Sequence, residues 1–300
     1  MRLYFLFLPA ILFMSCKNYV PQKFDLEGHR GCRGLLPENT IPAMLKAIDL
    51  NVNTLEMDVV ITADKKVIVS HEPFFSHEIT TLPGGDSIEA KNEWQYNIFH
   101  MTYDSVKLYD VGLKPHPRFP SQQKMKVVKP LLADLIDAVE TYLNKTNHSK
   151  VFYNIEIKSL DSSDHVYHPA PEEYADVLMK IIDHKKIANR VIIQSFDVRS
   201  LKIVSQKYPA MKLSLLVDVG NQIPLYDFKK LLGFQPDIIS PDYSMVTQQI
   251  TDSLHQRNIQ IIPWTVNDIE AAKKLYQMGV DGIITDYPDR INIEQLVYSS

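Results

Sequence analysis

From residue 24 onward, short runs rich in β-branched residues alternate along the chain with longer segments in which apolar residues recur every three or four positions. The short runs predict buried strands, and the longer segments predict amphipathic helices. This alternation is typical of repeated βα units. The predicted strands are Phe24 to Glu27, Thr54 to Ile61, Phe152 to Ile157, Val191 to Ser195, Lys212 to Val217, Ile238 to Ser240, Gln260 to Thr265 and Gly282 to Thr285.

Eight strand–helix units that close on themselves would form a (β/α)8 TIM barrel, which is the α/β fold that we predict. An open doubly wound sheet is the competing fold, but no Gly-x-Gly-x-x-Gly sequence follows the first predicted strand. The predicted helices are Ile41 to Leu50, Leu131 to Leu143, Tyr174 to His184, Val198 to Lys207, Thr247 to Arg257 and Ile269 to Met278.

The alternation is interrupted once, between His71 and Pro130, by an insertion of about residues 74–129. It contains Trp94 and the proline-rich run Lys114 to Pro120. Loops this long within a compact domain are usually lids, binding loops or small insertions. Because the active sites of barrels lie on the loops that follow the strands, an insertion after the second strand unit would lie over the mouth of the site. It is either a cap that sets specificity or a decoration without substrate contact.

Composition and charge narrow the choice of function. A length of 300 residues suits a single barrel domain. The composition, with 45% hydrophobic and 23% charged residues, argues against a disordered or multi-span membrane chain. Lysine and arginine total 32 against 36 acidic residues, a net charge of −4, so no overall basic field attracts nucleic acid. An anionic substrate must therefore be recognised locally.

The first 16 residues have the order of an export signal: Arg2, an apolar run from Leu3 to Met14, then Ser15 and Cys16. The apolar run is too short to cross a bilayer, which needs about 20 residues. A cysteine directly after a small residue resembles the bacterial lipobox. Ordinary signal cleavage beside an incidental cysteine is the alternative.

On the lipobox interpretation, residues 1–15 are a lipoprotein signal peptide and Cys16 is the lipidated first residue of the mature chain. Residues 16–23 then form a tether, and residues 24–300 form the barrel domain. This predicts a lipoprotein of the cell envelope, anchored to a membrane by acyl chains and lying on its periplasmic or extracellular side.

Candidate chemistry is concentrated at the ends of the predicted strands. His29 and Arg30 follow the first strand between two glycines. Glu56 and Asp58 are two residues apart on the second strand, so both carboxylates point to the same face, and Glu156 offers a third from the next strand. Each acid alone could be the partner of a nearby lysine. Three together predict a site for a hard divalent cation with oxygen ligands.

An ordered set of motifs resembles the glycerophosphodiester phosphodiesterase family from Phe24 to the C-terminal helix. The resemblance implies a (β/α)8 barrel that hydrolyses glycerophosphodiesters to glycerol phosphate and an alcohol with a divalent metal, usually Ca²⁺ or Mg²⁺. The motifs are His29-Arg30-Gly31, Pro37-Glu38-Asn39-Thr40, Glu56-x-Asp58, His71-Glu72-Pro73, Glu156-Ile157-Lys158, Gln194-Ser195-Phe196, Trp264-Thr265-Val266-Asn267 and the run Gly279 to Asp286.

The resemblance also implies roles for individual residues. His29 and His71 would be general acid and base, and a glycerol hydroxyl of the substrate would attack phosphorus to give a cyclic phosphate that water opens. The other roles are metal ligands for Glu56, Asp58 and Glu156, phosphoryl binding for Arg30 and Lys158, a further ligand or partner for Glu38, a polar wall for Gln194 and an apolar face for glycerol at Trp264. The plain alternatives for the last three are a helix cap, a buried amide and barrel packing.

Two other functions compete with this interpretation. A phosphatidylinositol-type phospholipase C also pairs two histidines on a barrel, but the three acids argue against its metal-free bacterial members. A lipid-anchored solute-binding protein would have no need of two proton carriers, which His29 and His71 would supply. The sequence leaves open the head group (choline, ethanolamine, glycerol or inositol) and the oligomeric state.

Overall fold

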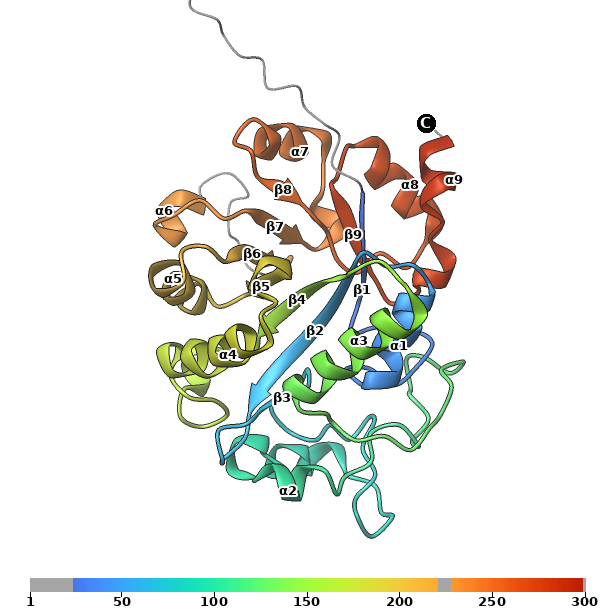
Figure 1. The fold of residues 1–300 in the computed structure, drawn as a ribbon, viewed down its shortest axis with the longest axis vertical. Coiled ribbons are helices and arrows are strands. Elements are labelled where there is room, and N and C mark those ends of the chain that lie inside the picture. Colours follow the sequence, from blue (N-terminus) through green and yellow to red (C-terminus); the bar gives the residue numbers. More distant parts are fainter. Residues whose placement is uncertain (1–23, 221–227, 299–300) are drawn as a thin grey trace, which may run out of the picture.

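The computed structural model describes residues 24–220 and 228–298, and eight parallel strands in these residues form a nearly closed barrel (Figure 1). The predicted TIM-barrel fold is confirmed. Neighbouring strands follow the order β8-β7-β6-β5-β4-β2-β1-β9. Their bounds are β1 Asp25–Gly28, β2 Thr54–Ile61, β4 Phe152–Ile157, β5 Val191–Ser195, β6 Lys212–Val217, β7 Ile238–Pro241, β8 Gln260–Ile261 and β9 Gly282–Thr285.

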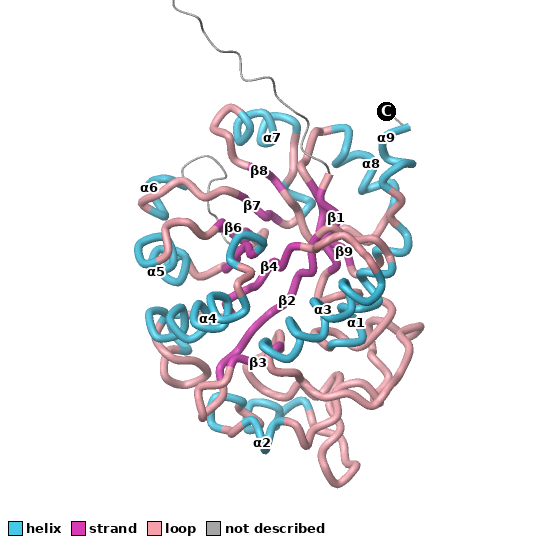
Figure 2. The backbone as a smooth tube through the Cα atoms, in the orientation of Figure 1, coloured by secondary structure: helices cyan, strands magenta, loops and turns pink. Residues whose placement is uncertain are grey.

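Helices surround these strands (Figure 2). Side-chain caps fix several helix starts: Asp197, Thr247 and Asp268 accept backbone N–H bonds at the first turns of α5, α7 and α8. The six predicted helices appear within three residues of their predicted ends, while the short α2, α6 and α9 were not predicted. The bounds are α1 Ile41–Asp49, α2 Tyr103–Val106, α3 Leu132–Thr146, α4 Pro171–Lys185, α5 Val198–Lys207, α6 Phe228–Leu232, α7 Gln248–His255, α8 Ile269–Gln277 and α9 Ile293–Tyr298.

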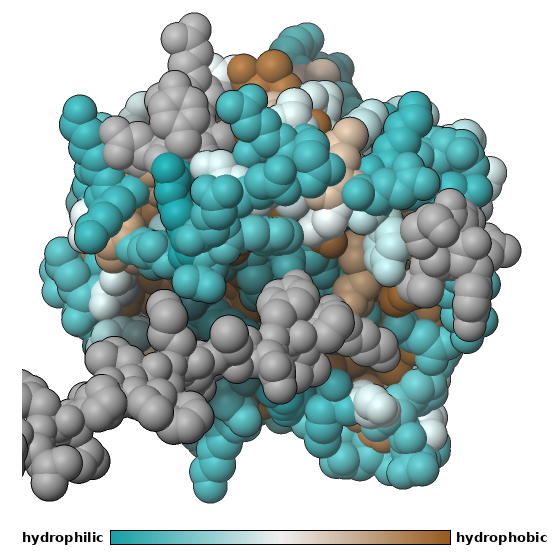
Figure 3. All heavy atoms as spheres, turned by 90° about the horizontal axis from the view of Figure 1, so that it is seen from above, coloured by the Kyte–Doolittle hydropathy of each residue, from teal (hydrophilic) through white to brown (hydrophobic). Residues whose placement is uncertain are grey.

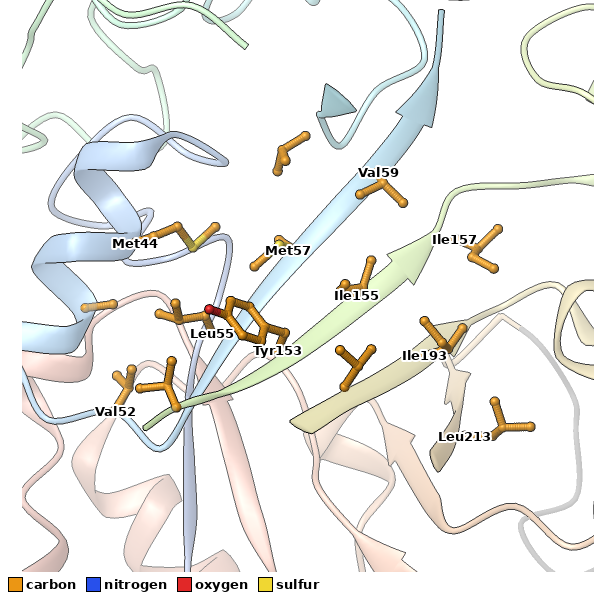
Figure 4. Close-up of a cluster of buried hydrophobic side chains, with 14 of the residues drawn as sticks. Met44, Val52, Leu55, Met57, Val59, Tyr153, Ile155, Ile157, Ile193 and Leu213 are labelled. Atoms are coloured by element: carbon orange, nitrogen blue, oxygen red, sulfur yellow. The ribbon is translucent and has the colours of Figure 1, made fainter. Parts of the chain in front are cut away.

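Alternation along each strand separates the core from the site. Leu55, Met57 and Val59 of β2 belong to the main hydrophobic core, which packs the strands against the surrounding helices (Figure 4). The residues between them, including Glu56 and Asp58, therefore face the barrel interior. Part of that interior is filled by a separate aliphatic cluster: Ile192, Ile238, Ile262 and Ile284.

The predicted strand Gln260 to Thr265 was too long, because β8 ends at Ile261. Pro263 has no N–H to donate, so a regular ladder cannot continue through it. The backbone nitrogens of Val266 and Ile284 nevertheless donate to Ile284 and Pro263, at 2.9 Å each, and hold this segment against β9. These bonds nearly close the barrel.

The insertion packs beside the barrel on a hairpin. The β-rich run before His71 forms β3 (Val67–Val69), which pairs antiparallel with β2. The chain then passes through α2 and short turns before α3, in the lower part of Figure 1. Its small core joins residues of this segment to the hairpin: Val60, Ile68, Phe75, Ile88, Ile98, Val106 and Val111.

The face of the molecule in Figure 3 is mostly hydrophilic, with smaller hydrophobic areas between polar side chains. Among the described helices, none is long and apolar enough to cross a membrane. The predicted signal peptide, Cys16 and the tether lie outside the described residues.

Candidate active site

Three buried carboxylates meet between the middle of β2 and the end of β4. Glu56, Asp58 and Glu156 each offer an oxygen within 4.8 Å of the other two. The cause is the register, because β2 and β4 are parallel neighbours in which Asp58 lies opposite Glu156. The structure thus brings together the three predicted metal ligands. Oxygen donors of this kind, close together and buried, fit a hard divalent cation.

Burial and neighbouring charges shift the pKa values of these three carboxylates in different directions. Burial and the neighbouring Asp58 raise the pKa of Glu56 well above its usual value. Burial also raises the pKa of Glu156 to about 7, although Lys158 opposes the shift. Burial acts against Asp58 too, yet the nearby His71, Arg30 and Lys158 lower its pKa. Crowded acids with raised pKa values are the environment that a bound cation would relieve.

The two predicted phosphate-binding cations lie beside this cluster. Lys158 Nζ is 2.8 Å from Glu156 Oε1 and 3.8 Å from Asp58 Oδ1. Arg30 Nε is 3.4 Å from Asp58 Oδ2, and its Nη1 donates to Glu38 Oε1 at 2.8 Å. Both cations therefore border the carboxylates.

The loop after β1 turns sharply to bring Arg30 into place. Arg30 has a φ of 49°, and its backbone N–H donates to Glu56 Oε2 at 2.7 Å. Gly31 follows with a φ of 85°, and a Cβ there would lie 2.7 Å from the carbonyl carbon of Ala43. Only glycine fits this close approach to α1.

His29 is held by an acid that the sequence analysis left without a role. Its Nδ1 lies 2.6 Å from Asp286 Oδ1, so Nδ1 carries the proton and Nε2 is left toward Glu56, 4.0 Å away. Asp286 also accepts from Arg33 Nε at 2.9 Å and from Asn267 Nδ2 at 2.8 Å. Burial and Arg33 lower the pKa of His29, although Asp286 opposes them. In the sequence, the only indication of a role for Asp286 was its place at the end of the family motif Gly279 to Asp286.

His71 also lies near the carboxylates, since it helps to lower the pKa of Asp58. Its Nδ1 lies 2.6 Å from Glu72 Oε1, an arrangement that parallels the pair of His29 and Asp286. Burial, Arg30 and Lys158 lower the pKa of His71 to about 4. Two imidazoles, each oriented by a carboxylate, therefore lie near the acidic cluster.

Glu38 is a partner of Arg30 and lies outside the carboxylate cluster. It is not the helix cap either, because Thr40 caps α1. Burial opposes its ionisation, but Arg30 and other donors hold its pKa well below the usual value. Its neighbour Asn39 donates to Asp58 Oδ2 at 2.8 Å and accepts from the Asp58 N–H at 3.2 Å. Asn39 belongs to the family motif Pro37 to Thr40, but the sequence analysis assigned no role to it.

Gln194 and Trp264 are the remaining predicted site residues of the barrel. Gln194 Nε2 donates to Glu56 Oε1 at 2.9 Å, and its Oε1 accepts from Asn154 at 3.1 Å, so this buried amide orients a carboxylate. Trp264 Nε1 donates to the Ser240 carbonyl at 2.8 Å, and its ring packs edge-to-face on Phe196. The Trp264 ring borders the cavity.

One cavity of about 300 Å³ collects these groups at the mouth of the barrel. Of the predicted site residues, Asp58, Lys158 and Glu38 adjoin it through the contacts above. Its lining also includes Arg33 and, from the insertion, Arg118, neither of which sequence analysis identified. The predicted residues that line it are His29, Arg30, Glu56, His71, Glu156, Gln194 and Trp264.

A barrel with buried acids, two oriented imidazoles and two cations at one mouth defines an enzyme site suited to a phosphate ester. The chain matches the Glycerophosphoryl diester phosphodiesterase family over residues 29–290 and belongs to that family. By class it is a phosphoric diester hydrolase.

Individual relatives agree with this assignment. The chain is 27% identical to the glycerophosphodiester phosphodiesterase of Caldanaerobacter subterraneus, over 88% of this chain and 94% of that protein. A crystal structure from Silicibacter pomeroyi, described as a glycerophosphoryl diester phosphodiesterase, has a TM-score of 0.81 at 26% identity, covering 93% and 94% of the two chains. An Oleispira antarctica phosphodiesterase solved with sn-glycerol-3-phosphate shares the fold, with a TM-score of 0.71 at 19% identity, over 91% and 96%.

Proposed function

We propose that this enzyme hydrolyses small glycerophosphodiesters to glycerol phosphate and an alcohol, and that the reaction depends on a divalent cation. The observation that carries the proposal is the convergence of Glu56, Asp58 and Glu156 within 4.8 Å, in reach of two imidazoles. The product named for the Oleispira antarctica structure supports the substrate class.

Glu56, Asp58 and Glu156 would hold the cation. The donor set is made of carboxylate oxygens, which suits Ca²⁺ or Mg²⁺. When bound, such a cation supplies Lewis-acid stabilisation of charge on the phosphoryl oxygens. Arg30 and Lys158 add positive charge from the protein beside the same position.

His29 and His71 move the protons. In the first step one imidazole takes the proton of a glycerol hydroxyl, whose oxygen bonds to phosphorus while the bond to the alcohol oxygen breaks. The other imidazole gives a proton to that departing oxygen. Water then opens the cyclic phosphate with the two roles exchanged. Both imidazoles have lowered pKa values, and an anionic phosphodiester between them would favour protonation of one.

A release assay tests this function. Glycerophosphodiesters should give glycerol phosphate, chelation should abolish the release, and added Ca²⁺ or Mg²⁺ should restore it. His29→Ala and His71→Ala should each lower turnover at least about a hundredfold with little change in melting temperature. Full activity after exhaustive chelation overturns the metal-dependent reaction. Chelator-insensitive cleavage of phosphatidylinositol identifies a phospholipase C, and binding without release identifies a solute-binding protein.

We also propose that Cys16 is lipidated and anchors the enzyme at the cell envelope, outside the cytoplasm. The support is the order of charged, apolar and small residues before Cys16. Labelled fatty acid should enter the wild-type protein, whereas Cys16→Ala should be unlabelled and should partition into the aqueous phase. Labelling of the alanine variant contradicts the proposal.

A further inference from the structure

A second cavity of about 270 Å³ adjoins the catalytic one. His71 lines both cavities, so they meet at a proposed proton carrier. The second cavity extends from His71 and Lys158 to Trp94 of the insertion and to the loop that follows β4. A substrate that spans the catalytic centre therefore has room on each side of His71.

Aromatic side chains from two separate segments form one wall of the second cavity. Phe74 and Trp94 belong to the insertion, and Tyr167 lies in the loop after β4. The ring centroids of Phe74 and Trp94 are 4.2 Å apart, and those of Trp94 and Tyr167 are 5.6 Å apart. At the rim, Trp94 is 54% exposed and Leu160 is 61% exposed. The wall thus offers a continuous apolar surface that is open to solvent.

Two polar side chains along this cavity, Ser159 and His168, already have protein partners. Ser159 Oγ donates to Asp197 at 2.9 Å and lies 2.8 Å from Ser200 Oγ. His168 accepts the Leu160 N–H with Nε2, and its Nδ1 lies 2.9 Å from the Pro169 carbonyl oxygen. A polyol placed against these two side chains and the aromatic wall would lose water from its hydroxyls and gain few bonds from them in return.

We propose that the second cavity binds the departing alcohol and selects alcohols whose far end is rich in methyl or methylene groups over polyols. The inference rests on the proposed function. An imidazole that protonates the departing oxygen must lie between the two parts of the substrate, and His71 occupies that junction. The glycerol part then lies in the first cavity, beside Trp264. A trimethylammonium group and an alkyl chain both have the required chemistry.

The test compares kcat/KM for the glycerophosphodiesters of choline, of 3,3-dimethylbutanol, of glycerol and of inositol. The second alcohol has the shape of choline without its charge. The wild type should favour the first two over the polyols. Trp94→Ala should lower the ratio of choline to glycerol diester activity about tenfold, as expected for loss of one aromatic contact. Leu108→Ala is the control, because Leu108 is 61% exposed in the insertion and does not line the cavity.

Each outcome decides a different point. A strong advantage of choline over its neutral analogue assigns the cavity to a quaternary ammonium group, and equal rates assign it to apolar contact alone. Leu160→Ser provides a second variant at the exposed rim and should lower the same ratio. An unchanged ratio in both variants, or wild-type preference for the polyols, overturns the inference while hydrolysis itself upholds the proposed function. Failure of the wild type to cleave any of the diesters overturns both.

Discussion

Two groups of acids inside the barrel differ in how their charge is balanced. At the mouth, Glu56, Asp58 and Glu156 border the cations Arg30 and Lys158. Asp25 and Glu27, which we call the deep acids, lie toward the start of β1 and away from the mouth. Within residues 24–220 and 228–298, their carboxylates have only neutral hydrogen-bond donors. Asp25 accepts from Thr54 Oγ1 at 2.9 Å, Glu27 Oε2 accepts from Asn154 Nδ2 at 2.7 Å, and Glu27 Oε1 has no hydrogen-bond partner among the described residues.

The difference shows that burial alone does not prepare an acid for function. Burial raises the pKa of Asp25 to about 6, and burial together with Asp25 raises the pKa of Glu27 well above its usual value. A raised pKa favours uptake of a proton, and in the part of the chain that the structure describes neither Asp25 nor Glu27 belongs to a group of three acids that could hold a cation instead. At the mouth, the nearby cations keep Asp58 ionised, and the close spacing of three acids gives a cation several ligands. The two groups are linked, because Asn154 bonds both Glu27 and Gln194, which bonds Glu56.

The largest expected effect is a difference in turnover between variants of the two groups of acids. Glu56→Gln removes a ligand from the mouth and should lower turnover at least about a hundredfold. Glu27→Gln resembles the protonated form of Glu27, which burial and Asp25 favour by raising its pKa, and should leave turnover within about twofold. Initial rates on one glycerophosphodiester, at saturating Ca²⁺ or Mg²⁺, provide the measurement. A large loss in Glu27→Gln with intact folding would show that the deep acids also serve the reaction.

A smaller expected effect concerns how the stability of the folded protein changes with pH. The folded-state pKa of Asp25 is raised, so this acid makes its most favourable contribution below about pH 4 and loses it as pH rises through about 6. Asp25→Asn should therefore be more stable than the wild type at pH 8, by about 1 kcal/mol, since the partly exposed carboxylate realises only part of the shift. At pH 4 the two proteins should be nearly equal.

Urea unfolding of both proteins between pH 4 and pH 8 measures this difference. Asp104→Asn is the control, because Asp104 is a surface residue and should show no gain that grows with pH. Loss of stability in Asp25→Asn at pH 8 would mean that the ionised carboxylate is favourable, and that the deep acids resemble those at the mouth.

Much of this protein is determined by the sequence itself. Strand alternation follows from backbone geometry, so the spacing of Glu56 and Asp58 was enough to place both carboxylates on the inner face. Helix periodicity located the main helices, and the order of strands and helices indicated the barrel. These signals are local, and each depends on a few neighbouring residues.

Only the tertiary structure decided which distant side chains meet. Asp286 reaches His29 across 257 positions because β9 pairs with β1, and Asn39 reaches Asp58 because the loop after β1 folds over β2. The insertion has no periodic pattern from which its path could be predicted. Trp94 lies beside Phe74 and Tyr167 because the insertion packs on the β2–β3 hairpin. Such contacts depend on chain closure and packing between elements, which no local pattern records.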